Sequence, residues 1–115
     1  REQFDEMIRS GKTFLVDYWA PWCGYCRKIE VAYEAVSETW GRSIPVAKIN
    51  IDEEKQLSDS QGIEIIPTLV LYKDGKAAAT LRVPESRDMI EQFLTDSWKQ
   101  PVRRVILSPP AFTIL

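Results

Sequence analysis

The feature that most constrains this chain is the segment Trp22-Cys23-Gly24-Tyr25-Cys26, which holds both of its cysteines. The segment stands where an apolar, strand-like run, residues 14–19, gives way to a long amphipathic pattern typical of a helix. A cysteine at a helix N-terminus faces unpaired backbone N–H groups and the positive end of the helix dipole, which stabilise a thiolate. The sequence therefore predicts that Cys23 is a nucleophilic thiol.

The second cysteine is placed to work with the first. Cys26 lies three residues after Cys23, one turn inside the expected helix and on the same face. Its sulfur can therefore reach Cys23 and displace a partner bound there, which makes Cys26 the expected resolving thiol of a disulfide-exchange pair. A purely structural disulfide is the alternative, although a bridge that closes so small a loop removes little entropy from the unfolded chain.

Metal binding is another chemistry that paired cysteines can serve. A structural zinc site usually needs four cysteine or histidine ligands, and this chain has two cysteines and no histidine. A zinc site within one chain would have to recruit carboxylates, and an iron–sulfur cluster would need cysteines from a second chain. We therefore predict no bound metal. We also predict no bound cofactor, because the sequence contains no glycine-rich phosphate-binding fingerprint.

Composition and charge fit one globular domain. The 115 residues are 44% hydrophobic, which is enough for a core, and the formal net charge of -2 gives no general attraction to nucleic acid. No apolar run approaches the roughly twenty residues of a membrane span, and no signal-peptide pattern opens the chain. We expect a cytoplasmic location. A periplasmic or other extracytoplasmic location is the alternative if a signal or anchor preceded Arg1.

Strand and helix patterns alternate along the chain. Phe4, Met7 and Ile8 recur at helical spacing before Gly11, which predicts a short first helix. The other expected elements are a central strand over residues 13–19, a helix over 23–40 supported by apolar residues that include Val31, a strand over 44–51, a short helix over 53–60, a strand over 68–72, a hairpin turn at 73–76, a strand over 77–83 and a helix from about residue 85 to 98. This order predicts an α/β fold with a mixed central sheet and helices on both faces.

Three segments resemble the thioredoxin family in order and spacing. They are residues 16–26 (VDYWAPWCGYC), residues 47–52 (AKINID) and residues 62–69 (GIEIIPTL), and the resemblance runs from Phe4 to Trp98. A lone Cys-x-x-Cys is a weak signal, but this strand before it and the later Ile-Pro-Thr make the combination specific. The resemblance implies a thioredoxin fold over residues 1–100, with most of the family's first strand missing before Phe4.

The same resemblance implies a function. Thioredoxin-like proteins are protein thiol-disulfide oxidoreductases, so we expect an enzyme of electron transport and cell redox homeostasis whose redox group is the Cys23-Cys26 disulfide. Its partners would be protein disulfide substrates and a separate reductase or redox partner. The alternative is a thioredoxin-like binding or chaperone module in which the disulfide is incidental.

The resemblance also implies roles for residues distant from the cysteines in sequence. Pro67 would be a cis-proline beside the disulfide, leaving the backbone of Ile66 free to pair with an extended substrate. Asp17, a carboxylate within an apolar strand, would lie beneath the disulfide and exchange a proton with Cys26, and burial would raise its pKa. Lys48 would moderate that shift; a lysine that snorkels to the surface is its alternative.

Residues beside the cysteines are expected to contact substrates. They are Trp22, which matches an exposed indole of the family, Gly24 and Tyr25. The family usually has proline at the position of Tyr25, and the added backbone N–H near the helix start should stabilise the thiolate. We therefore expect a reduction potential above the roughly -270 mV of a typical thioredoxin and below the roughly -180 mV of disulfide isomerase.

Further departures from the family lie along the helix and near the C-terminus. Val31 replaces a kinking proline, so the long helix should be straighter, and Val83-Pro84 replaces a glycine of the family's docking surface. Residues 101–115 form an extension. Its apolar run, residues 102–107, is expected either to add a strand at a vacant sheet edge or to be part of a flexible tail.

Overall fold

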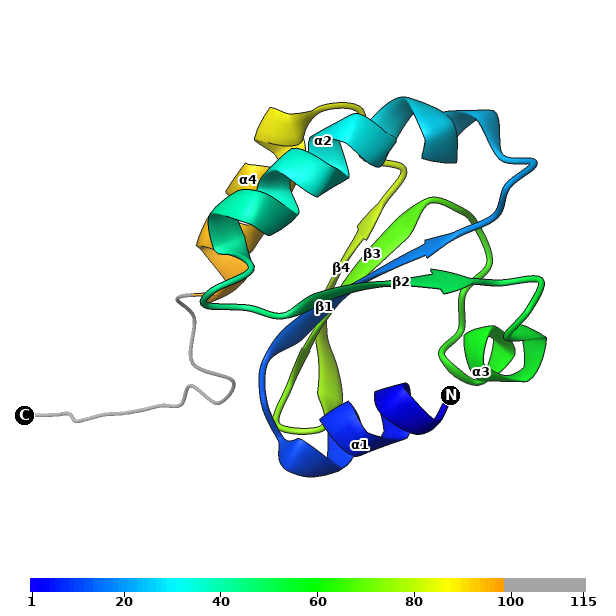
Figure 1. Cartoon of the computed structure of the whole chain (residues 1–115), viewed down its shortest axis with the longest axis vertical. Helices are drawn as coiled ribbons and strands as arrows, with labels where there is room; N and C mark the ends of the chain where they lie inside the picture. Colours follow the sequence, from blue (N-terminus) through cyan, green and yellow to red (C-terminus); the bar gives the residue numbers. More distant parts are fainter. Residues whose placement is uncertain (99–115) are drawn as a thin grey trace, which may run out of the picture.

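The computed structural model describes residues 1–98, in which helices and strands alternate (Figure 1). In chain order the elements are α1 (Glu2–Ser10), β1 (Phe14–Trp19), α2 (Gly24–Trp40), β2 (Val46–Asn50), α3 (Lys55–Ser60), β3 (Thr68–Lys73), β4 (Lys76–Arg82) and α4 (Arg87–Trp98). Each element predicted from the sequence is present, with its ends moved by no more than about two residues, the usual uncertainty of such boundaries. The predicted extension 101–115 and the strand suggested for residues 102–107 lie outside the described residues.

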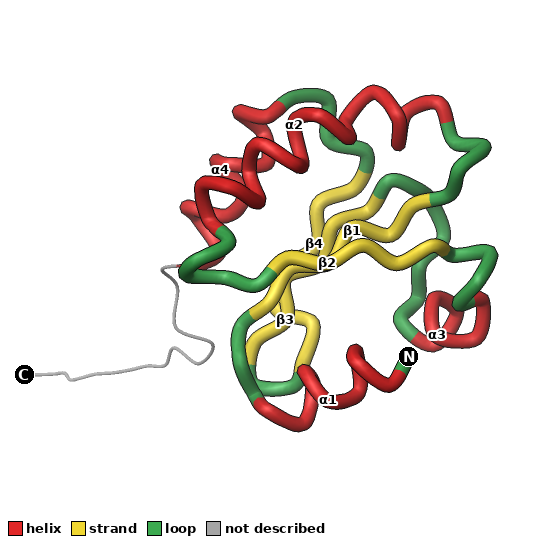
Figure 2. Tube along the Cα trace, viewed as in Figure 1, coloured by secondary structure: helices red, strands yellow, loops and turns green. Residues whose placement is uncertain are grey.

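The strands form one mixed sheet in the order β2-β1-β3-β4. β1 runs parallel to β2 and antiparallel to β3, and β3 is antiparallel to β4. Figure 2 shows α2 and α4 on one side of the sheet and α1 and α3 on the other. The mixed α/β architecture and the central position of β1, both expected from the sequence, are confirmed.

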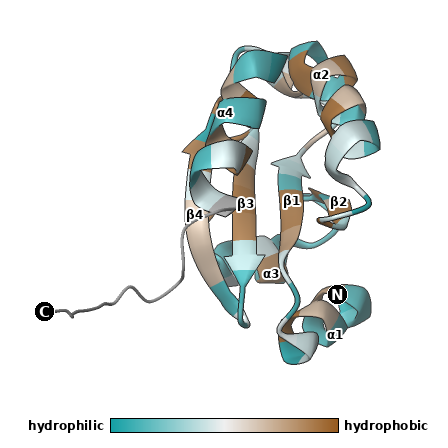
Figure 3. Cartoon of the chain, turned by 90° about the vertical axis from the view of Figure 1, so that its left-hand side faces the viewer, coloured by the Kyte–Doolittle hydropathy of each residue, from teal (hydrophilic) through white to brown (hydrophobic). Residues whose placement is uncertain are grey.

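The side chains of β1 alternate between two cores, because successive residues of a strand point to opposite faces. Leu15 packs in the core formed with α2 and α4, whereas Val16 and Tyr18 pack in the core that α1 helps to cover. In Figure 3 the hydrophobic colour runs along β1 and β3, between these helices. Asp17 falls on the same face as Leu15, so the sheet places this carboxylate beneath α2.

One of the apolar residues of α2 faces solvent and not the core. Val31, counted in the sequence pattern among the apolar residues supporting this helix, is 75% exposed. The inward side of α2 carries Cys26, Ile29, Tyr33 and Val36. Because each helical residue advances by about 100°, Val31 lies nearly opposite both Ile29 and Tyr33 and must face solvent.

The chain leaves β4 through a strained residue. Val83 has φ 48°, in the left-handed region that β-branched residues rarely adopt. Its backbone N–H donates a hydrogen bond of 2.8 Å to the carbonyl oxygen of Pro67, at the start of the neighbouring strand. The position at which the family resemblance calls for glycine is therefore one where the backbone conformation itself favours glycine.

We expect Val83→Gly to raise the free energy of unfolding by about 1 kcal/mol. Relief of left-handed strain, roughly 1 to 2 kcal/mol, outweighs the extra freedom that glycine gives the unfolded chain, roughly 0.4 to 1 kcal/mol. Urea or thermal unfolding of the two proteins measures the difference. Val83→Ala keeps a Cβ and most of the strain, so it is the control and should not gain this stability. A glycine variant less stable than the parent would contradict the argument.

Candidate functional site

A disulfide joins Cys23 and Cys26 at the first turn of α2. Cys23 is the N-cap of the helix, and its Sγ accepts a hydrogen bond of 3.1 Å from the backbone N–H of Cys26. The carbonyl oxygen of Cys23 accepts a hydrogen bond from the backbone N–H of Arg27. The positively polarised end of the helix therefore points at the sulfur of Cys23, where it would stabilise a thiolate.

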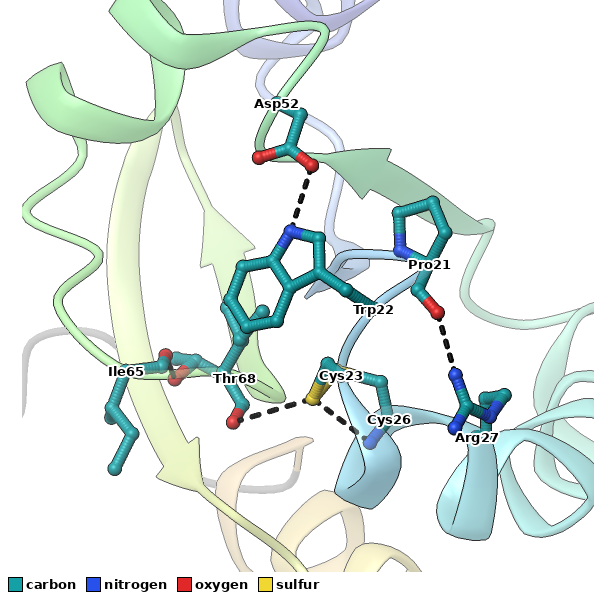
Figure 4. The surroundings of a disulfide bond; sticks show 9 residues. Pro21, Trp22, Cys23, Cys26, Arg27, Asp52, Ile65 and Thr68 are labelled. Carbon is teal, nitrogen blue, oxygen red and sulfur yellow. Dashed lines mark hydrogen bonds between the residues drawn. A yellow bond between two sulfur atoms is a disulfide. The ribbon is translucent and has the colours of Figure 1, made fainter.

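The disulfide is shielded on its inner side. Cys23 and Cys26 are only 6% and 5% exposed, and Ala20, Ile51 and Ile66 pack around them. The Sγ of Cys23 lies 3.8 Å from the carbonyl oxygen of Ile66. The peptide bond between Ile66 and Pro67 is cis. The structure thus brings the redox pair against the segment that leads into β3 (Figure 4).

Trp22 stands beside the disulfide and is held by a carboxylate. Its indole is 65% exposed, and the indole N–H donates a hydrogen bond of 2.9 Å to Oδ2 of Asp52 (Figure 4). The backbone N–H of Asp52 is in turn bonded to the side chain of Asn50. No role for Asp52 was predicted from the sequence. The signal that could have placed Asp52 near Trp22 is the parallel pairing of β1 and β2, because the residues that follow parallel strands emerge at the same edge of the sheet.

Exposed apolar side chains flank the shielded disulfide. Tyr25 is 64% exposed and Ile65 is 48% exposed, the latter not identified from the sequence. Gly24 is also exposed, and a Cβ added there would meet no atom within 4 Å. Together with Trp22 these residues leave an open apolar surface around the cysteines, a feature typical of contacts with a protein partner.

Asp17 is buried without a hydrogen-bond partner for one of its oxygens. The residue is 2% exposed, and within residues 1–98 its Oδ1 accepts no hydrogen bond. Burial raises the pKa of Asp17 to about 7; Lys48 lowers this pKa and Glu30 raises it, both to smaller extents. Burial, with a contribution from Asp17, also raises the pKa of Tyr33 on α2. Asp17 therefore sits under the helix face that carries Cys26.

Lys48 lies opposite Asp17 in the parallel register of β1 and β2. Its Nζ is 3.4 Å from Oε2 of Glu30 and 4.5 Å from the centre of the Trp19 ring. The side chain is 33% exposed, so its stem lies along the protein while its charge acts on both carboxylates. The structure brings Asp17 and Lys48 together, but among residues 1–98 no hydrogen bond joins either of them to a cysteine.

The site is a surface and not a deep cavity. A hollow of about 560 Å³ lies between α1, β2 and α3, and neither cysteine lines it. An exposed apolar surface suits a macromolecule better than a small ligand, which usually binds in a concave pocket. Between Arg1 and Trp98, no three His, Cys, Asp or Glu side chains gather closely enough to hold a metal ion. No helix in the same range is long and apolar enough to cross a membrane.

Comparison with known proteins gives one consistent result. The family model described as thioredoxin matches residues 1–96. The thioredoxin of Alicyclobacillus acidocaldarius is 37% identical over 93 residues, which cover 81% of this chain and 89% of that protein. The thioredoxin of Rhodospirillum rubrum is 42% identical over 76 residues, covering 66% and 73%. The crystal structure of Malassezia sympodialis thioredoxin superimposes with a TM-score of 0.77 at 29% identity, covering 84% of this chain and 86% of that one.

We expect Asp17→Asn to stabilise the protein at pH 8 by on the order of 4 kcal/mol, the free-energy equivalent of raising the pKa from 3.8 to about 7. Well below pH 3.8 the carboxyl is protonated in both states and the penalty vanishes. As the pH rises towards 7, the unfolded chain releases the proton while the folded protein keeps it, so stability falls. Above pH 7 the loss levels off.

Urea unfolding of parent and Asn variant between pH 3.5 and pH 9 measures this effect. The exposed Asp59 provides the matched control, since Asp59→Asn should change stability little at any pH. A parent whose stability does not fall between about pH 4 and pH 7, relative to Asp17→Asn, would show that the carboxyl ionises normally in the fold.

Proposed function

The chain belongs to the thioredoxin family and is a protein thiol-disulfide oxidoreductase, and on that premise we propose that Cys23 attacks the substrate, Cys26 resolves the intermediate and Asp17 moves the proton. The redox group is the Cys23-Cys26 disulfide itself. The observation that carries these assignments is the hydrogen bond from the backbone N–H of Cys26 to Cys23 Sγ, which distinguishes the two sulfurs. Family membership implies protein substrates and a reductase that returns the electrons.

The first step uses the reduced form of the pair. The Cys23 thiolate attacks one sulfur of a substrate disulfide, a new Cys23–substrate S–S bond forms, and the substrate's own S–S bond breaks. The departing substrate sulfur leaves as a thiolate and takes a proton from solvent. The helix N-terminus at Cys23 favours this step because it keeps the attacking sulfur ionised near neutral pH.

The second step releases the substrate. Cys26 loses its proton and attacks Cys23, so the Cys23–Cys26 bond forms as the Cys23–substrate bond breaks. The second substrate sulfur leaves as a thiolate and takes a proton from solvent, so the substrate has gained two electrons and two protons. Asp17 accepts the proton of Cys26. Its burial under the same helix face and its pKa of about 7 support this role, because a base with a pKa near the working pH is the most effective. Lys48 supports this role of Asp17 because its positive charge lowers the pKa of Asp17 and so offsets part of the rise that burial causes.

The substrate binds across the exposed surface around the disulfide. Trp22, Gly24 and Tyr25 contact the substrate on one side, and the backbone of Ile66 before Pro67 pairs with it as an extended segment. The exposure of Trp22 and Tyr25 and the 3.8 Å separation between Cys23 Sγ and the Ile66 carbonyl oxygen support this surface. Pairing through backbone atoms tolerates varied side chains, which fits a range of protein substrates.

The domain comprises residues 1–100 and acts in the cytoplasm with a separate reductase. The match of the family model to residues 1–96 supports the domain limits. The cytoplasmic assignment rests on family membership, with an extracytoplasmic pathway as the alternative. Substrates captured from cells on the Cys26→Ser variant would identify the compartment, because resolution by Cys26 is then blocked and the mixed disulfide on Cys23 persists.

We expect the parent protein to accelerate insulin reduction by dithiothreitol, followed as turbidity. Cys23→Ser should have no activity above the uncatalysed rate, because it lacks the attacking thiol. Cys26→Ser should turn over poorly and accumulate a mixed disulfide with insulin, visible by mass spectrometry. A parent no faster than Cys23→Ser would instead favour the alternative, a binding or chaperone module with an incidental disulfide.

The reduction potential should lie between roughly -270 and -180 mV, and Tyr25→Pro should lower it, because proline removes a backbone N–H at the start of α2. Equilibration with glutathione redox buffers measures the potential. Tyr25→Ala keeps that N–H and is the matched control, expected to remain near the parent. If Tyr25→Ala fell as far as Tyr25→Pro, the effect would belong to the tyrosine side chain and not to the backbone donor.

A further inference from the structure

A chain of two side-chain hydrogen bonds, one buried and one partly buried, joins β1, β3 and the end of α3. The hydroxyl oxygens of Tyr18 and Tyr72 are 2.7 Å apart, and the hydroxyl of Tyr72 is 3.0 Å from Oε1 of Gln61. Tyr18 and Tyr72 are 0% and 1% exposed, in a core whose other buried members are Phe14, Val16 and Val70. Burying a hydroxyl is unfavourable unless it is hydrogen-bonded, so phenylalanine would meet the packing demand more simply.

The donors and acceptors allow one orientation of this chain. The carbonyl oxygen of Gln61 can only accept, so the O–H of Tyr72 donates to it. The oxygen of Tyr72 then accepts the O–H of Tyr18, and each hydroxyl hydrogen has one acceptor. Burial raises the pKa of both phenols, so both remain neutral donors at physiological pH. The bonds therefore run from the centre of the sheet outward to Gln61.

The bond between Tyr72 and Gln61 closes a loop beside the active site. Gln61 is the C-cap of α3, and its backbone N–H donates to the carbonyl oxygens of Leu57 and Ser58. Tyr72 lies in β3, which begins just after Pro67. The hydrogen bond between Tyr72 and Gln61 thus joins the two ends of the stretch 61–72. The segment 62–67, between α3 and β3, lies within this closed loop.

Ile66 connects the tied loop to the cysteines. Its side chain packs both against the core that contains Tyr18 and Tyr72 and against the cluster of Cys23 and Cys26. Its carbonyl oxygen is the atom 3.8 Å from Cys23 Sγ. A shift of the loop would therefore move the backbone that faces the reacting sulfur.

We propose that the Tyr72–Gln61 hydrogen bond, oriented by Tyr18, is a clasp that holds segment 62–67 in place and so sets the affinity for extended protein substrates. Gln61 and Tyr72 are positioning residues, because they act through Ile66 and not on the substrate, whereas Tyr18 only donates a hydrogen bond to Tyr72. The inference rests on the proposed docking role of Ile66. A small disulfide needs only the sulfur of Cys23, so the clasp should discriminate between extended polypeptides and small disulfides.

Kinetics with two substrates test the clasp. Urea unfolding first shows that each variant is folded. KM and kcat are then measured for insulin reduction. The second-order rate constant of the reduced protein is measured with a small aromatic disulfide. Gln61→Leu removes the acceptor and should raise KM for insulin by roughly threefold to tenfold, the equilibrium effect of about one hydrogen bond. Its kcat and its rate with the small disulfide should stay within about twofold of the parent.

Conservative variants separate the clasp from general stability. Gln61→Glu retains an acceptor oxygen and should restore the parent KM, whereas Tyr72→Phe should reproduce the effect of Gln61→Leu. Tyr18→Phe also removes a buried hydrogen bond but leaves the Tyr72–Gln61 bond intact, so it should change KM by less than about twofold. If Tyr72→Phe does not fold, the partly exposed Gln61 variants still decide the question.

Two results would overturn the proposal. One is an unchanged KM for insulin in Gln61→Leu, and the other is an equal loss with insulin and with the small disulfide. Failure of the proposed docking surface is recognised separately. If the surface around the disulfide does not bind the substrate, substituting the exposed Trp22 or Tyr25 also leaves the KM for insulin unchanged. If only the clasp fails, these substitutions raise KM and Gln61→Leu does not.

Discussion

The structure depends on the burial of β1 on both faces of the sheet. Strands on either side and helices above and below exclude water from its length, so residues 14–18 are all buried. This constraint is what makes Asp17 unusual, since a carboxyl there is removed from water and its pKa rises to about 7. The same strand leads into the segment that carries the cysteines, so one element both positions the redox pair and buries a carboxyl with a raised pKa beneath it.

The two parallel strands β1 and β2 each lead into one part of the site. β1 leads into Trp22 and Cys23, and β2 leads into Asp52, whose carboxylate holds the indole of Trp22. Residues that follow parallel strands emerge at the same sheet edge, which explains why groups 30 positions apart in sequence meet there. The disulfide is consequently shielded below and flanked above by an ordered, exposed aromatic side chain.

The segment before β3 forms the other side of the site. It is tied to the sheet at Tyr72 through Gln61, and Pro67 is tied to the end of β4 through Val83. Among residues 1–98, neither tie includes a hydrogen bond to a cysteine sulfur. The Ile66 backbone opposite Cys23 therefore lies between two hydrogen bonds to neighbouring elements, and Val83 adopts a strained conformation in making one of them.

The sequence by itself determined the elements, the mixed sheet, the placement of Cys23 at the start of α2 and the burial of Asp17, because periodicity and capping are local properties. Even the exposure of Val31 follows from helical spacing once the inward face is assigned. Only the tertiary structure decided which distant polar groups meet. The partners of Trp22, Lys48 and Tyr72 lie 30, 18 and 11 positions away, and such pairs depend on strand register and loop path, which no local pattern encodes.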